Sequence, residues 1–221
     1  QLCQITVRRS VKQKIQVVTF IATISLIFSY GNKFSYVNTV GGAGKVGLEH
    51  TPELTDRTDG YTRLARIGEG HTTVEGMPEL PEFTTFYQLD PSKTYEFQFQ
   101  VLNSYIIEGI AILPHQGMEK WEVESVDVIN EGVYNSYSAF PEQNMLVSDR
   151  MQGRGIEFVS IQVIPYKYYP KYKKLEVYTS IDIQVVETGD NLDHTLFQPN
   201  RSHIFDEFYK DLIVNFSYSD R

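Results

Sequence analysis

The chain has 221 residues, 41% of them hydrophobic, which is enough to bury a core and excludes a fibrous or wholly disordered protein. Its formal net charge of -8 excludes a nucleic-acid-binding protein, because neutralising phosphates requires clustered Lys and Arg. The one cysteine, Cys3, excludes an internal disulfide framework. The 15 tyrosines and 13 phenylalanines, against one tryptophan, favour a fold built from β-strands.

Residues 1–31 have the pattern of a secretory signal peptide. Residues 15–28 are uncharged and mostly apolar, and small residues at Ser29 and Gly31 suit cleavage after Gly31. The apolar run is shorter than the about 20 residues that a membrane-spanning helix needs, so we expect no stable membrane span. A retained anchor at the lipid interface and a buried pair of strands are the alternatives. The signal-peptide interpretation predicts a secreted, extracellular protein.

Residues 32–75 are rich in Gly, Thr and polar residues, which predicts a loosely structured lead-in with one or two short strands, such as one over residues 61–67. The sequence Gly-Met-Pro-Glu-Leu-Pro then begins at residue 76. Its two prolines, Pro78 and Pro81, hold the backbone extended. We therefore expect one compact domain over residues 76–221.

The compact domain is predicted to consist of short antiparallel strands. Residues 94–101 alternate apolar and polar side chains, as a half-buried strand does, and residues 175–185 do so over a longer stretch. Residues 131–155 show no periodicity and predict a long polar loop. Further strands are predicted over residues 84–89, 105–113, 122–130 and 156–164.

The end of the domain is predicted to be helical. After Ser202, apolar residues recur at helical spacing over residues 203–216, and Asp206 and Glu207 suit the first turn of a helix. The predicted fold class is therefore all-β: an antiparallel β-sandwich with one C-terminal amphipathic helix packed on the sheets.

A search for catalytic groups finds no nucleophile beside a base and no serine hydrolase elbow, so we predict neither catalytic nor cofactor-binding residues. The glycines of residues 41–45 lack the Ser or Thr of a phosphate-binding loop and predict a flexible linker. No metal site is predicted, because the histidines lack the close spacing of zinc ligands: His50, His71, His115, His194 and His203. A calcium site formed by Asp149, Asp190 and Asp193 is the alternative kept open.

Three segments together resemble the propeptide of gingipain-type cysteine peptidases, over roughly residues 60–221. The first is the Gly-x-Pro-x-Leu-Pro sequence at residues 76–81, and the third is the closing segment of residues 203–221. The second is a Pro-Tyr-x-Tyr-x-Pro sequence followed by Leu-x-x-Tyr-Thr, which is matched by Pro165, Tyr166, Tyr168, Pro170, Leu175, Tyr178 and Thr179.

The resemblance implies a secreted zymogen, in which a non-catalytic prodomain assists folding of a cysteine peptidase catalytic domain and inhibits it. It also implies that a basic residue enters the specificity pocket in Arg-specific members, and that the prodomain ends at an Arg where it is processed. Arg221 is the matching processing site. The family's inhibitory Arg falls close to Lys120, with Arg150 and Arg154 as rival candidates. The alternative for each of the three is a solvated surface charge.

A second function from a different class stays open, namely a stand-alone secreted β-sandwich that binds protein or glycan. Its contact patch would consist of tyrosines, for which packing between strands is the other interpretation. These tyrosines are Tyr134, Tyr137, Tyr166, Tyr168 and Tyr169.

Overall fold

The computed structural model describes residues 34–39, 44–64, 70–117, 126–193 and 203–217. Residues 1–33 and 34–221 form two separate units. The predicted signal peptide of residues 1–31, with Cys3, lies outside the described residues. No helix in the described ranges is long and apolar enough to cross a membrane.

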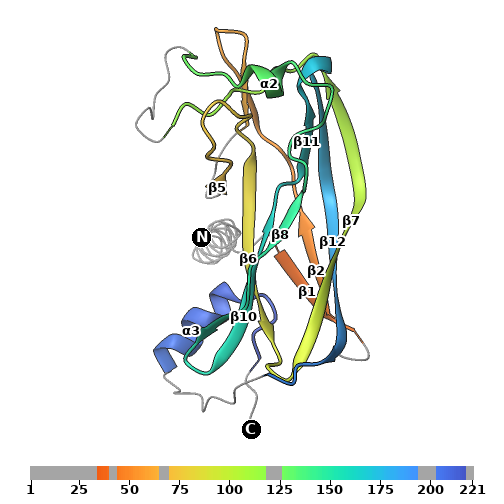
Figure 1. Cartoon of the computed structure of the whole chain (residues 1–221), viewed down its shortest axis with the longest axis vertical. Coiled ribbons are helices and arrows are strands. Elements are labelled where there is room, and N and C mark those ends of the chain that lie inside the picture. Colours follow the sequence, from red (N-terminus) through yellow and green to blue (C-terminus); the bar gives the residue numbers. More distant parts are fainter. Residues whose placement is uncertain (1–33, 40–43, 65–69, 118–125, 194–202, 218–221) are drawn as a thin grey trace, which may run out of the picture. The chain divides into compact units, whose positions relative to one another are not determined.

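The described part of residues 34–221 is made mainly of β-strands (Figure 1). The first seven strands are β1 (Phe34–Asn38), β2 (Gly44–Glu49), β3 (Leu54–Asp56), β4 (Thr62–Leu64), β5 (Gly70–His71), β6 (Pro81–Leu89) and β7 (Lys93–Glu108). The remaining elements are α2 (Glu131–Tyr134), β8 (Met145–Val147), β9 (Met151–Gly153), β10 (Ile156–Val163), β11 (Tyr166–Tyr169), the 3-10 helix η1 (Pro170–Tyr172), β12 (Lys174–Asp190) and α3 (His203–Leu212).

Two antiparallel sheets of five strands face each other. In the first sheet β12 pairs along one edge with β7 and along the other with β11 and β2, and β1 pairs with β2. The second sheet has the order β5-β6-β10, with β8 and β9 both paired to the far edge of β10. A separate ladder joins β3 and β4. The predicted antiparallel β-sandwich is therefore confirmed.

The main core lies between the two sheets and draws on both. Ile181 and Ile183 of β12 and Val46 of β2 pack with Phe83 of β6 and Ile161 of β10, and all five side chains are buried. Their alternation with polar residues places one face of each strand inward. A second core cluster lies around Leu64, Leu80, Ile110, Ile112, Tyr166, Tyr168, Leu175 and Val177.

The lead-in of residues 32–75 contributes more structure than its composition predicted, since five strands lie in it. The glycines of β2 allow close packing rather than flexibility: a Cβ on Gly44 would lie 2.8 Å from Tyr36 Cε2, and one on Gly47 would lie 2.7 Å from Ser35 Oγ. Gly44 had been predicted to belong to a flexible linker. That prediction is wrong for Gly44, because the neighbouring strand's side chains fill the space that a larger residue would need.

Two other predictions also differ from the structure. Residues 126–130, the described part of the strand predicted over 122–130, form no strand. Residues 131–155, predicted to be one loop, contain α2, β8 and β9. These three elements are only three or four residues long, and so short a segment shows no periodicity of its own.

The helix α3 begins where the sequence predicted it, but its apolar face is only partly covered. Tyr209 is 7% exposed and packs on Phe158, whereas Ile204 is 78% exposed and Phe208 is 55% exposed. A backbone contact with the second sheet follows the helix: Val214 N donates to Phe86 O, so the chain beyond α3 pairs with β6.

Candidate functional site

One buried amide side chain joins residues 114–117 to residues 126–130, the two segments on either side of residues 118–125, which lie outside the described residues. These two segments together are called the neck. Gln116 is 5% exposed, and its Nε2 donates to Pro114 O at 3.0 Å and to Val128 O at 2.8 Å. Its Oε1 accepts from Asp127 N at 2.8 Å and from Val128 N at 3.0 Å. A single side chain therefore holds the two segments of the neck together, and its hydrogen-bonding capacity is fully used.

The Gly-Met-Pro sequence of residues 76–78 lies between the two segments of the neck, and its backbone is hydrogen bonded to both of them. Gly76 N donates to His115 O at 2.7 Å, and His115 N donates to Met77 O at 2.8 Å. On the other side Asn130 N donates to Gly76 O at 3.0 Å. Gly76 has φ 77°, and a Cβ there would lie 2.9 Å from Asn130 N. This position thus requires glycine, which accounts for the first residue of the motif.

The predicted inhibitory candidates are not gathered in one place. Lys120 lies outside the described residues, between the two segments of the neck in the sequence, and Arg221 also lies outside them. Arg150 precedes β9, and Arg154 lies between β9 and β10. The neck adjoins α2, whose N-cap is Asn130, and α2 and α3 lie at opposite ends of the sandwich (Figure 1).

Arg150 and Arg154 are each held by neighbouring groups at the α3 end. Arg150 Nη1 donates to Glu157 Oε1 at 2.8 Å, and its Nη2 donates to Lys93 O. Arg154 is exposed with φ 52°, and its guanidinium carbon lies 3.8 Å from the centre of the Phe205 ring. Both side chains therefore have partners within the chain itself.

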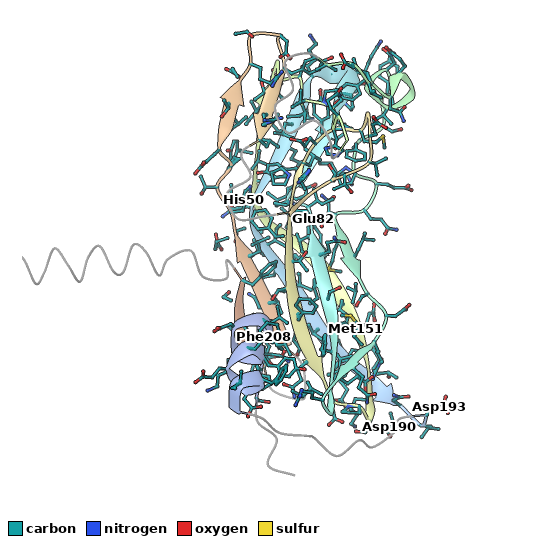
Figure 2. All side chains as sticks on the ribbon, turned by 90° about the vertical axis from the view of Figure 1, so that its left-hand side faces the viewer. His50, Glu82, Met151, Asp190, Asp193 and Phe208 are labelled. Atoms are coloured by element: carbon teal, nitrogen blue, oxygen red, sulfur yellow. The ribbon has the colours of Figure 1, made fainter. Side chains whose placement is uncertain are left out.

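The calcium alternative gains no geometric support. Asp190 and Asp193 lie at the far end of β12 (Figure 2). Asp190 Oδ1 lies 2.9 Å from Lys93 Nζ. The hydrogen bonds that Lys93 makes to the carboxylates of Glu187, the larger cause, and Asp190 raise the pKa of Lys93. Among the described residues, neither aspartate belongs to a group of three or more possible metal ligands.

The tyrosines proposed as a contact patch mainly pack inside. Tyr166 and Tyr168 are each 1% exposed, and Tyr134 Oη donates to Ile112 O at 2.8 Å. Burial raises the pKa of Tyr134, so its hydroxyl stays a donor. Tyr137 is 66% exposed. One exposed ring among these residues does not make a binding surface.

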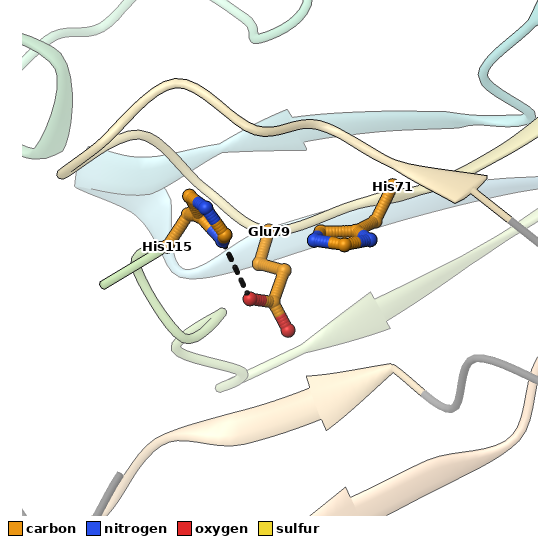
Figure 3. A group of neighbouring side chains, drawn as sticks. All are labelled: His71, Glu79 and His115. Carbon is orange, nitrogen blue, oxygen red and sulfur yellow. Dashed lines mark hydrogen bonds and ion pairs between the residues drawn. The ribbon is translucent and has the colours of Figure 1, made fainter. Parts of the chain in front are cut away.

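A group that sequence spacing did not reveal lies beside the neck (Figure 3). His71, Glu79 and His115 come together from three separate segments, and His115 Nδ1 lies 3.1 Å from Glu79 Oε2. The ring centroids of His71 and His115 are 5.2 Å apart. Spacing along the chain did not reveal this group, because it contains no information on residues that only the fold brings together.

Residues 56–220 match the family model Propeptide_C25. The chain therefore belongs to the Propeptide_C25 family, and the resemblance to gingipain propeptides inferred from its sequence is confirmed.

The relatives include gingipain R1 of Porphyromonas gingivalis, which is 25% identical over 170 residues, covering 75% of this chain and 16% of that protein. Gingipain R2 of P. gingivalis strain ATCC 33277 is 25% identical over 176 residues, covering 76% of this chain and 23% of that protein. The chain thus spans less than a quarter of the length of these relatives.

Two solved structures share the fold. The complex of P. gingivalis RgpB pro- and mature domains matches with a TM-score of 0.66 and 19% identity, covering 84% of this chain and 97% of that chain. A structure of gingipain K from the same organism, described as an insight into zymogenic latency, matches with a TM-score of 0.55 and 17% identity, covering 72% and 94%.

Proposed function

We propose that this chain is the secreted propeptide of a gingipain-like cysteine endopeptidase precursor, which assists folding of the catalytic domain and inhibits it until cleavage. Membership of the propeptide family supports the proposal, together with a solved relative whose description names a complex of pro- and mature domains. The observation that carries it is the neck on either side of residues 118–125. Four hydrogen bonds to one buried side chain hold the two segments that flank Lys120 in the sequence, which limits the entropy lost when a partner binds there.

Within this proposal Lys120 is the residue that enters the specificity pocket. A side chain that fills such a pocket must project away from its own domain. Arg150 is hydrogen bonded to Glu157 and to Lys93 O, and Arg154 is stacked on Phe205, so either would have to give up those contacts first. Tethering in one precursor supplies a high effective concentration, so inhibition needs little intrinsic affinity.

The test compares three variants of the purified chain as inhibitors of the gingipain-type catalytic domain from the same source. Lys120→Ala is expected to raise the inhibition constant at least about tenfold, because it removes the anchor from a buried pocket. Arg150→Ala and Arg154→Ala are expected to change it less than about twofold. Unchanged inhibition by Lys120→Ala would exclude Lys120, and a wild-type chain that does not inhibit would overturn the inhibitor proposal itself.

Arg221 is proposed as the processing site of the precursor. In a precursor that contains the catalytic domain, Arg221→Gln is expected to abolish cleavage after this residue, because the mutant lacks the positive charge that an Arg-specific pocket recognises. Mass spectrometry of the released fragments gives the cleavage position. Release of a fragment that ends at position 221 in the variant would contradict the assignment.

A further inference from the structure

The cluster of His71, Glu79 and His115 joins three parts of the chain beside the neck. His71 ends β5, Glu79 lies in the extended segment before β6, and His115 precedes Gln116. One possible ligand atom from each residue lies within 4.8 Å of the other two (Figure 3). Glu79 lies between the two imidazole rings in this view.

Burial makes this cluster unlike a surface group of charges. Glu79 and His115 are each 4% exposed, whereas His71 is half-buried. A buried carboxylate requires a compensating positive charge or several hydrogen bonds. Arg63 Nε forms an ion pair with Glu79 Oε1 at 3.5 Å, and Glu79 Oε2 faces His115 Nδ1.

Hydrogen bonding alone does not account for a histidine at position 115. Its Nδ1 contacts Glu79, but its buried Nε2 has no hydrogen-bond partner among the described residues. Imidazole is the most common metal ligand among neutral side chains, and Nδ1 is the His115 nitrogen that faces Glu79.

The spacing fits a small ion with short bonds. Two ligands at about 2.0–2.1 Å from a tetrahedral Zn²⁺ lie about 3.3 Å apart, close to the 3.1 Å between His115 Nδ1 and Glu79 Oε2. His71 is on a two-residue strand and only half-buried, so a small side-chain rotation can bring it to bonding distance. Two imidazoles and one carboxylate suit zinc, whereas Ca²⁺ and Mg²⁺ prefer oxygen ligands throughout.

We propose that His71, Glu79 and His115 form a binding site for one divalent transition-metal ion of the zinc class, with a fourth position for water. The ion would join β5, the Met77–Glu79 backbone and the residue next to Gln116, and so clamp the neck. The site does not depend on the chain acting as an inhibitor, because metal binding is measured on the chain alone.

The experiment uses the full chain without an affinity tag, freed of metal by a chelator. Titration with ZnCl₂ against a chromophoric competitor is expected to show one equivalent bound, and CoCl₂ is expected to give the visible spectrum of four-coordinate Co²⁺. Glu79→Gln and His71→Gln are expected to weaken Zn²⁺ binding at least about tenfold. His203→Gln, which removes a histidine at the start of α3, is the matched control and is expected to stay within about twofold of the wild type.

Circular dichroism separates lost binding from lost folding. His71→Gln is the decisive variant, because its half-buried position makes a folded product expected. Zn²⁺ is expected to raise the midpoint of thermal unfolding in the wild type and in His203→Gln, but not in His71→Gln. The absence of saturable binding near one equivalent, or equal Zn²⁺ affinity in a folded His71→Gln and the wild type, would overturn the proposal.

Discussion

Gln116 is the single residue on which the geometry of the candidate site most depends. Gln116→Ala leaves two carbonyls and two amides of the neck, most of them partly buried, without their partner. The expected loss is about 1–3 kcal/mol in the free energy of unfolding, because unsatisfied buried groups keep their desolvation cost. Urea denaturation measures the loss.

The matched control for this substitution is Gln100→Ala. The Gln100 side chain accepts one hydrogen bond from Gln184 Nε2 at 3.3 Å and is exposed, so its removal is expected to change stability by less than about 0.5 kcal/mol. Limited proteolysis is expected to cut the Gln116→Ala chain between residues 117 and 126 faster than it cuts the wild-type chain. Equal stability losses in the two variants would contradict the anchoring role of Gln116.

The segment that follows α3 attaches the helix to the second sheet, more than the apolar face of the helix does. Ile213 is 1% exposed and forms a bridge with Phe86 of β6, while Asn215 exchanges hydrogen bonds with the backbone of Gln88. Ile213→Ala is expected to cost about 2–5 kcal/mol, because it leaves a cavity at the edge of the second sheet. Ile204→Ala removes the same atoms from a 78% exposed position and is expected to cost less than about 0.5 kcal/mol. Thermal unfolding of the two variants tests this; a similar shift in both would contradict it.

Local periodicity was sufficient to predict the strands that carry most of the core. The strand predicted over residues 94–101 lies within β7, and the one over 175–185 lies within β12, because alternation shows directly which side chains face inward. The alternation of inward and outward side chains fails at Thr179, which the pattern of residues 175–185 placed on the same inward face as Val177 and Ile181. The register between β12 and β7 shifts on both sides of Ser180, so Tyr178 and Ser180 are buried there instead.

The candidate site could be predicted from the sequence to a much smaller extent than the sheets could. The importance of Gly76 was visible as part of a motif, but the role of Gln116 was not, since an isolated glutamine in a polar turn segment has no distinguishing pattern. The grouping of His71 with Glu79 and His115 depends on pairing between segments far apart in the chain. Such contacts are created by the packing of the whole sandwich, and no local rule contains them.

The whole sandwich requires residues that the sequence had suggested were a loose lead-in, so the predicted domain boundary at residue 76 can be tested directly. Val46 and Leu48 of β2 pair with Ile183 and Ile181 of β12 and are fully buried, and Leu64 of β4 belongs to the second core cluster. A chain that begins at residue 76 loses these three side chains, each contributing about 1.5–3 kcal/mol. The combined loss is comparable with the whole stability of an ordinary domain, which is about 5–15 kcal/mol.

We therefore expect a chain of residues 76–221 to show no cooperative unfolding transition, whereas a chain of residues 34–221 keeps β1 to β5 and unfolds cooperatively. Circular dichroism during heating and the dispersion of amide signals in NMR spectra distinguish the two outcomes. If both shortened chains unfold at the same midpoint, β2 contributes nothing to the core and the boundary at residue 76 is correct. If only the longer chain folds, the propeptide domain begins before residue 76, and the edge of β12 that pairs with β2 is covered by the chain's own N-terminal strands.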